Sequence, residues 1–169
     1  MTEMKKNPAR NIHLKKGPSK LLETINASID VDKRLYKEDI EGSIAHTKML
    51  GHQKIISKKE QTKIISGLEK ILKDIKTGKV KFKKELEDIH MNIEKRLFQI
   101  IGEDAGYVHT ARSRNDQVIT DFKIWIRSAT NEINKSLDNI IKTILKASEK
   151  NIYTIMPGFT LLKNAHPVS

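Results

Sequence analysis

The stretch between Gly106 and Pro157 contains neither glycine nor proline, and its apolar residues recur at helical spacing. At about 1.5 Å rise per residue, a helix over residues 113–151 would be a rod of roughly 57 Å. A chain of 169 residues builds only a modest core, which cannot bury the whole apolar stripe of such a rod. Long periodic helices of this kind belong to helical bundles or coiled coils. The stripe consists of Val118, Phe122, Trp125, Ile126, Ala129, Ile133, Leu137, Ile140, Ile141, Ile144 and Leu145.

The residues before this run predict further helices, so the expected fold class is all-α. Residues 32–50 read as one helix, with a partial apolar face formed by Leu35, Ile40, Ile44 and Met49. A capping box at 57–60 begins a second helix that Gly78 ends. A third runs over 89–101 and stops at Gly102. Between the last two, Val80 and Phe82 alternate with lysines and suggest a short strand.

The net charge of +11 invites a nucleic-acid interpretation, but the positive charge is concentrated in two places. Residues 1–20, which also carry Pro8, Gly17 and Pro18, are expected to form a basic, flexible arm. Residues 54–84 form a lysine-rich helical stretch. Aromatic residues do not interleave with these lysines as in a base-stacking surface. A solvated lysine-rich face is therefore favoured over a nucleic-acid partner.

The sequence favours a cytoplasmic protein without a metal or cofactor. It has no cysteine, so it offers neither a disulfide framework nor a thiolate metal site. No apolar stretch is long enough for a transmembrane helix, and the N-terminus lacks the apolar core of a secretory signal. No carboxylate or histidine lies at a convincing metal-ligand spacing from His13, His46, His52 or His90, so no metal site is expected.

Residues 109–117 concentrate polar donors where the long helix begins, and read His-Thr-Ala-Arg-Ser-Arg-Asn-Asp-Gln. The N-terminus of a helix offers free N–H groups and the positive end of its dipole, which suit an anion. Arginine adds a planar fork that matches a carboxylate. The alternative is that these residues only cap the helix and form surface ion pairs.

These residues resemble the first signature region of the argininosuccinate lyase family, which includes the delta-crystallins and belongs to the fumarase/aspartase superfamily. The resemblance extends over about 21–169. It includes 26–29, Asp32, Leu35 and 39–43 near the N-terminus, 87–90 and 101–102 before the motif, and 156–160 and 165–167 after it. It implies a flexible arm at 1–20, an N-terminal helical lyase domain at 21–111, and the start of a central helical-bundle domain at 112–169. Family members are tetramers whose active sites each draw on three subunits.

The resemblance also implies a reaction and a set of binding residues. The family eliminates fumarate from argininosuccinate to give arginine, and needs no cofactor. Ser28 and Asp32 would hold the amino-acid end of the arginine moiety, and Thr160 would contact the succinyl part. The substrate carboxylates would be met by Arg112, Ser113, Arg114 and Asn115. Local alternatives exist. Ser28 and Asp32 could merely cap the helix that starts near them, and Thr160 could stabilise a loop. Asp116 and Gln117 could be first-turn residues favoured by the helix dipole.

The chain departs from the family at several positions. Leu161 stands where the family has a histidine that takes part in proton transfer, and a leucine cannot move a proton. Lys163 replaces a glutamine, and His166 lies five positions beyond Leu161. Ala111 replaces a usual glycine. The family's third signature region, a loop with the catalytic serine, has no counterpart here, so no catalytic residue is assigned.

Three functions follow as hypotheses. The first is an argininosuccinate lyase-type protein that is truncated or degenerate and inactive alone. The second is a non-catalytic substrate-binding or assembly subunit, forming a homo-oligomer or pairing with another lyase chain. The third, a basic nucleic-acid-binding module, ranks last.

Overall fold

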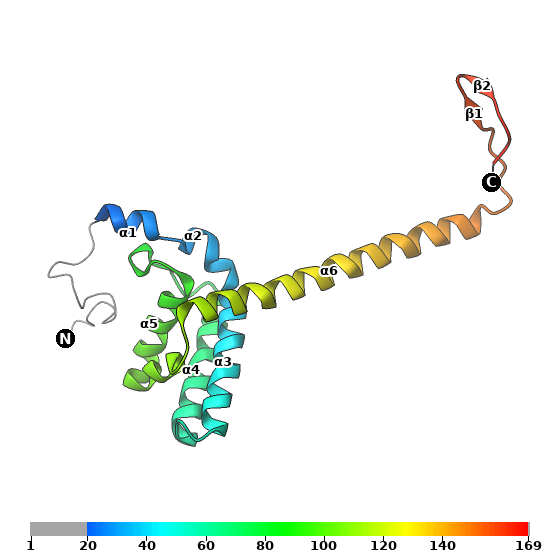
Figure 1. The fold of residues 1–169 in the computed structure, drawn as a ribbon. Coiled ribbons are helices and arrows are strands. Elements are labelled where there is room, and N and C mark those ends of the chain that lie inside the picture. Colours follow the sequence, from blue (N-terminus) through cyan, green and yellow to red (C-terminus); the bar gives the residue numbers. More distant parts are fainter. Residues whose placement is uncertain (1–19, 169) are drawn as a thin grey trace. The chain divides into compact units, whose positions relative to one another are not determined.

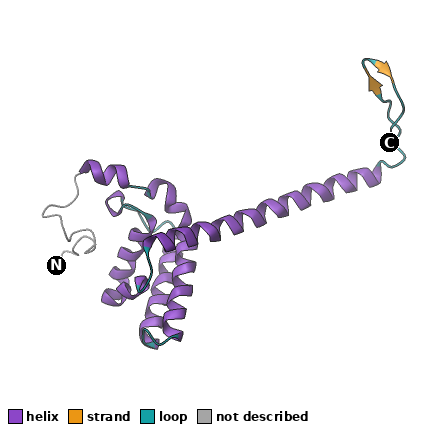
Figure 2. Ribbon diagram, in the orientation of Figure 1, coloured by secondary structure: helices purple, strands orange, loops and turns teal. Residues whose placement is uncertain are grey.

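A computed structural model describes residues 20–168 and is built almost entirely of helices (Figures 1 and 2). The all-α prediction is confirmed. Among the described residues the only strands are β1 (Phe159–Thr160) and β2 (Lys163–Asn164), which pair antiparallel. Except for Lys20, the predicted basic arm lies outside the described residues.

The N-terminal helices depart from the prediction of one helix over 32–50. Helix α1 (Lys20–Asn26) and the short α2 (Ile29–Asp32) are followed by the 3-10 helix η2 (Lys33–Leu35), and only then by α3 (Tyr36–His52). The buried face of α3 is also more polar than predicted, because Ser43 and Thr47 lie on it together with Ile40 and Leu50. Met49, placed on the apolar face by the sequence interpretation, is 42% exposed.

Helix α4 (Lys58–Lys76) begins and ends where the sequence predicts. The Ser57 hydroxyl accepts from the Glu60 amide at 3.2 Å, while the Glu60 carboxylate accepts from the Ser57 amide at 2.6 Å. This reciprocal pair satisfies two amides that have no partner inside the helix. Gly78 follows the helix with a φ of +70°, a conformation that glycine adopts without strain.

The predicted strand at Val80 and Phe82 is wrong. Residues 79–83 have no regular structure and lead into the 3-10 helix η3 (Lys84–Leu86). A strand needs a partner for its backbone groups, and the described strands pair only with each other. Phe82 instead packs against the core, which accounts for its apolar character.

Helix α5 (Ile89–Ile101) and the 3-10 helix η4 (Gly102–His109) complete the framework around the core. The Asp88 carboxylate caps α5 by accepting from the Met91 amide at 2.6 Å, and Gly102 follows with a φ of +75°, as the predicted stop requires. Helices α3, α4 and α5 lie side by side (Figure 1). The buried apolar residues are Ile29, Ile40, Leu50, Ile56, Ile64, Leu68, Ile71, Ile89, Ile93, Leu97, Ile101, Ala105 and Val108.

Helix α6 (Arg114–Lys150) is 37 residues long and confirms the predicted long helix. The described residues form two compact units that divide between Trp125 and Ile126, so the start of α6 belongs to the first unit. In that unit Gln117 and Asp121 are buried. In the second unit α6 exposes the apolar side chains of Ile133, Leu137, Ile140, Ile141, Ile144 and Leu145. Within the described part of the chain, no helix is long and apolar enough to cross a membrane.

Candidate functional site

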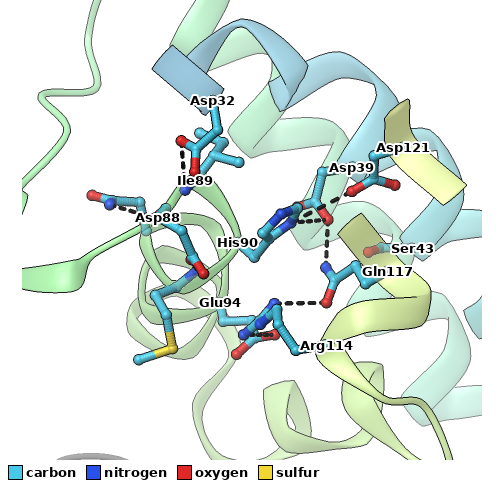
Figure 3. Close-up of polar contacts among 12 residues, drawn as sticks. Asp32, Asp39, Ser43, Asp88, Ile89, His90, Glu94, Arg114, Gln117 and Asp121 are labelled. Carbon is cyan, nitrogen blue, oxygen red and sulfur yellow. Dashed lines mark hydrogen bonds and ion pairs between the residues drawn. The ribbon is translucent and has the colours of Figure 1, made fainter. Parts of the chain in front are cut away.

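Ser28 and Asp32 form a linked pair just before α3. The Ser28 hydroxyl donates to Asp32 Oδ2 at 2.6 Å, and Asp32 Oδ1 accepts from the Ile89 amide at 3.2 Å. The Ser28 side chain makes no capping bond to α2, so the simple capping alternative fails for this residue. Asp32 does accept a hydrogen bond from the first amide of a helix, but that helix is α5 and not its own helix α2. The pair therefore joins the N-terminal segment to the start of α5 (Figure 3).

Two side chains of α3 form hydrogen bonds with the loop that precedes α6. His46 Nε2 donates to the Thr110 carbonyl at 2.9 Å, and Arg112 Nη2 donates to Ser43 Oγ at 3.2 Å. Ala111 lies between them with a φ of +53°, in the left-handed region where alanine is strained. Burial lowers the pKa of Arg112, against the opposing attraction of Asp39 and Asp121. Arg112 is thus a partly buried cation that is attracted by three carboxyl groups, those of Asp39, Asp121 and Glu94.

The first turn of α6 divides its residues between the interior and solvent. Arg114 faces inward, donating from Nη1 to Gln117 Oε1 at 2.6 Å and pairing through Nη2 with Glu94 Oε1 at 2.9 Å. Ser113 Oγ accepts from the Asn115 amide at 3.2 Å, and Asp116 Oδ2 accepts from the Ser113 amide at 3.4 Å. Both side chains therefore accept hydrogen bonds from backbone amides where α6 begins. Ser113 and Asn115 remain exposed beside the amides that begin α6.

Electrostatic interactions connect the pair of Ser28 and Asp32 with the residues where α6 begins. Asp88 lies between them, and its pKa is raised by burial and by the negative charge of Asp32, against the attraction of Arg114 and His90. Glu94 is shared, because His109 Nδ1 lies 3.4 Å from the same Oε1 atom that pairs with Arg114. Asp88 therefore interacts electrostatically with both Asp32 and Arg114.

A buried polar network lies beneath the motif (Figure 3). Asp39 Oδ1, on α3, is 2.9 Å from His90 Nδ1, on α5, and also accepts from Gln117 Nε2, on α6. Asp121 Oδ2, one turn further along α6, lies 3.4 Å from the same His90 nitrogen. Sequence reasoning missed this network, since its members are far apart in the sequence. The one local signal was that Asp39 and Ser43 share a helix face with Ile40, where a polar residue needs a buried partner.

The network sets the charge of its three ionisable groups. Burial and the negative charge of Asp39 raise the pKa of Asp121 to about 8. Burial also opposes the charged forms of Asp39 and His90, but their mutual hydrogen bond and attraction outweigh it, lowering the pKa of Asp39 and raising that of His90. At neutral pH the network therefore holds an ionised Asp39 and a protonated Asp121.

The same three side chains are the one group in the described residues that could hold a metal ion. Asp39, His90 and Asp121 each offer a ligand atom, all within 4.8 Å of one another. Protonation of Asp121 explains the same close approach, because a carboxylic acid can lie beside a carboxylate without repulsion. The prediction that the protein binds no metal stays a prediction.

Thr160 lies in the second unit, on a short hairpin. Strands β1 and β2 pair Phe159 with Asn164 and Thr160 with Lys163, and the turn consists of Leu161 and Leu162. Both turn residues have positive φ, +47° and +62°, and are 91% and 100% exposed. The position that holds histidine in the family therefore carries an apolar side chain at the tip of a turn.

Comparison with known proteins identifies the family. The sequence model of a family described as lyase matches residues 13–169. The chain belongs to this lyase family. The recognition made from residues 109–117 is therefore confirmed.

Individual relatives are argininosuccinate lyases. The chain is 70% identical over 156 residues to the argininosuccinate lyase of Pelagibacter ubique, covering 92% of the chain and 34% of that protein. It is 54% identical over 164 residues to the argininosuccinate lyase of Ehrlichia chaffeensis, and this match covers 97% of the chain and 35% of that protein. It is 50% identical over 153 residues to the argininosuccinate lyase of Bartonella bacilliformis, and this match covers 90% of the chain and 33% of that protein. The chain thus spans about a third of the length of the curated relatives it matches.

Proposed function

We propose that this chain carries argininosuccinate-binding groups of an argininosuccinate lyase. One observation supports this most. Ser113 and Asn115 are exposed at the start of a 37-residue helix, while the arginines that flank Ser113 are held by Ser43, Gln117 and Glu94. The exposed donors and the helix N-terminus suit a substrate carboxylate. The relatives' shared name supplies the substrate class.

Elimination of fumarate requires positive charge and donors near a carboxylate. When a base removes the proton next to the carboxylate, negative charge builds up on it, and fixed donors stabilise that charge. In this proposal Ser113 and Asn115 donate to the carboxylate, while Arg112 and Arg114 position the segment and supply positive charge. Asp32 pairs with the ammonium group of the arginine moiety, because its two engaged oxygens still have free lone pairs. Thr160 contacts the succinyl part.

A binding measurement tests this proposal. In a titration of the chain with argininosuccinate, the double variant Ser113→Ala, Asn115→Ala should bind roughly tenfold or more weakly, since each hydrogen bond to a charged group contributes about 1.5–3 kcal/mol. Ser136→Ala, Asn139→Ala changes the same residue types on the exposed part of the same helix and should bind as the wild type does. Equal affinity in all three proteins would contradict the proposal.

We further propose that residues 1–169 alone release no fumarate. The reason is Leu161, whose side chain stands at the family's histidine position and cannot transfer a proton. Fumarate release can be followed by its ultraviolet absorbance. Release that disappears in Ser28→Ala, Asn115→Ala would overturn this part of the proposal and make His109 and His166 the next residues to replace.

The second candidate function is that of an assembly subunit. The chain would associate either with copies of itself, as in the tetramers of the family, or with another lyase chain. The exposed apolar residues of α6 in the second unit favour it. Co-purification of the chain with a full-length lyase chain in a defined complex would support it.

A nucleic-acid-binding module ranks last, and undetectable binding of RNA at low salt would remove it. A cytoplasmic location accords with the lack of cysteine.

A further inference from the structure

The loop between α4 and α5 encloses a cavity whose charged lining is entirely positive. The cavity has a volume of about 170 Å³ and lies between residues 79–86 and one face of α5. It is lined by five cationic side chains and no acidic one. These are Lys79, Lys81, Lys83, Lys95 and Arg96. The seven proposed substrate-binding residues contribute nothing to this lining.

The loop that carries three of these lysines is fixed at both ends. After the turn at Gly78, the Lys79 amide donates to the Asp74 carbonyl at 2.9 Å. At the other end, the side chain of Asn92 accepts from the Lys83 amide at 2.8 Å and donates to the Lys83 carbonyl at 3.2 Å. Asn92 is itself only 8% exposed. Because the backbone is already ordered, a ligand need not order it on binding.

The positive charge around the cavity is weakly compensated. Among the described residues, the four lysines form no ion pair, and the one ion pair of the lining joins Arg96 Nη2 to Asp74 Oδ2 at 3.4 Å. Arg96 Nη1 makes one further long contact, to Gln99 Oε1 at 3.3 Å, and its Nε atom is buried without a hydrogen-bond partner in the described part of the chain. Like charges held close together repel one another, so an anion in this cavity would relieve repulsion as well as gain attraction.

We propose that this cavity binds a small anion with two or more phosphate charges, such as pyrophosphate or the phosphates of a free nucleotide. Four of the five cations are lysines, whose ammonium groups act as point charges toward phosphate oxygens, whereas a planar carboxylate favours paired arginine forks. The cavity has a volume of only about 170 Å³, which suits a compact anion rather than a polymer.

Titration of the full chain with inorganic pyrophosphate at constant ionic strength tests the site. Binding should be saturable, and in the nuclear magnetic resonance spectrum the shifted amides should cluster in residues 79–83 and 92–99. Lys81→Ala, Lys83→Ala should weaken binding at least tenfold, since two charge-assisted contacts are lost. The backbone bonds of Lys83 are kept in this variant, so the loop should still fold; Lys95→Ala provides an independent change from α5.

The matched control is Lys59→Ala, Lys70→Ala, which removes the same charge from exposed positions of α4 outside the cavity. This control should change the affinity less than twofold. Equal losses in both double variants would overturn the proposal, because they would mean general attraction to a basic surface. It would also be overturned by the absence of saturable pyrophosphate binding, or by tight binding of a short single-stranded RNA that is insensitive to Lys81→Ala, Lys83→Ala.

Discussion

Asp121 shows how a single residue depends on partners from distant parts of the chain. Its carboxyl group is 1% exposed and is enclosed by residues of α3 and α5. A Cβ atom at Gly42, on α3, would come within 3.2 Å of Asp121 Oδ1, so the carboxyl group and α3 are in close contact. The absence of a side chain at Gly42 is what allows this buried acid to approach Asp39.

We predict that the raised pKa of Asp121 makes stability fall as pH rises. The folded protein holds this proton up to a pKa of about 8, whereas the unfolded chain releases it near the ordinary value of 3.8. Between these values each pH unit should remove up to about 1.4 kcal/mol of unfolding free energy. His90, with a raised pKa, adds a loss in the same direction above its ordinary value of 6.5. Denaturation by urea from pH 5 to pH 8 measures the slope.

The variant Asp121→Asn isolates this contribution. Asparagine keeps the shape and the donor of the protonated acid but cannot ionise. The variant should therefore lose stability less steeply than the wild type between pH 5 and pH 8. Asp138→Asn, an exposed position on the same helix, should keep the wild-type slope. Parallel curves for wild type and Asp121→Asn would show that Asp121 does not hold its proton.

A second residue-scale prediction concerns Ala111. Its φ of +53° lies in the left-handed region, which costs a non-glycine residue about 1–2 kcal/mol. Ala111→Gly should raise the unfolding free energy by about 0.5–1 kcal/mol, after subtracting the extra freedom that glycine gives the unfolded chain. Ala45→Gly, exposed within α3, should instead lower it by about 1 kcal/mol. Destabilisation by both changes would mean that the loop adapts to alanine without strain.

At the scale of elements, the contact between α4 and α5 depends on Gly67. A Cβ atom there would lie 2.6 Å from Leu97 Cδ1 and 3.1 Å from Ile101 Cγ2, both on buried side chains. We predict that Gly67→Ala lowers the unfolding free energy by about 1–2 kcal/mol, because overpacking outweighs the gain in helix propensity. In a Leu97→Val background, which removes the nearest atom, the cost should become smaller. Thermal unfolding of the four proteins measures this coupling, and strict additivity would contradict it.

The ends of the elements could be predicted because their causes are local. Ser57 and Glu60 are three residues apart, so each side chain can accept from the backbone amide of the other when a helix begins just after Ser57. Gly78 and Gly102 mark helix ends for an equally local reason, since both have positive φ.

Other features could not be predicted because they depend on which helices meet. The hydrogen bond between Asp39 and His90 joins residues 51 positions apart, and that between Asp39 and Gln117 joins residues 78 apart. Alternation at Val80 and Phe82 looks like a strand, yet Phe82 packs on a helical core. Periodicity identifies which residues are apolar, but not whether a second strand exists to pair with them.

At the scale of the whole molecule, the two compact units differ in how they bury apolar surface. The first has a continuous core, whereas in the second, Ile133, Leu137, Ile140, Ile141, Ile144 and Leu145 are each 51–60% exposed. Monomeric proteins rarely leave so large an apolar stripe in water. The pattern on α6 is therefore that of a bundle helix without its neighbours.

We predict that the chain self-associates through this stripe. Sedimentation should show association that increases with protein concentration, because apolar side chains repeated along one face of a helix bury well against a second copy. Leu137→Lys, Ile141→Lys places two charges on the stripe and should shift the protein towards monomer. Asn139→Lys, Thr143→Lys adds the same charge at the same spacing on the opposite side of the helix, and should leave association unchanged. A wild-type chain that stays monomeric at all concentrations would contradict the prediction, and equal effects of the two variants would mean that charge, not the apolar stripe, controls association.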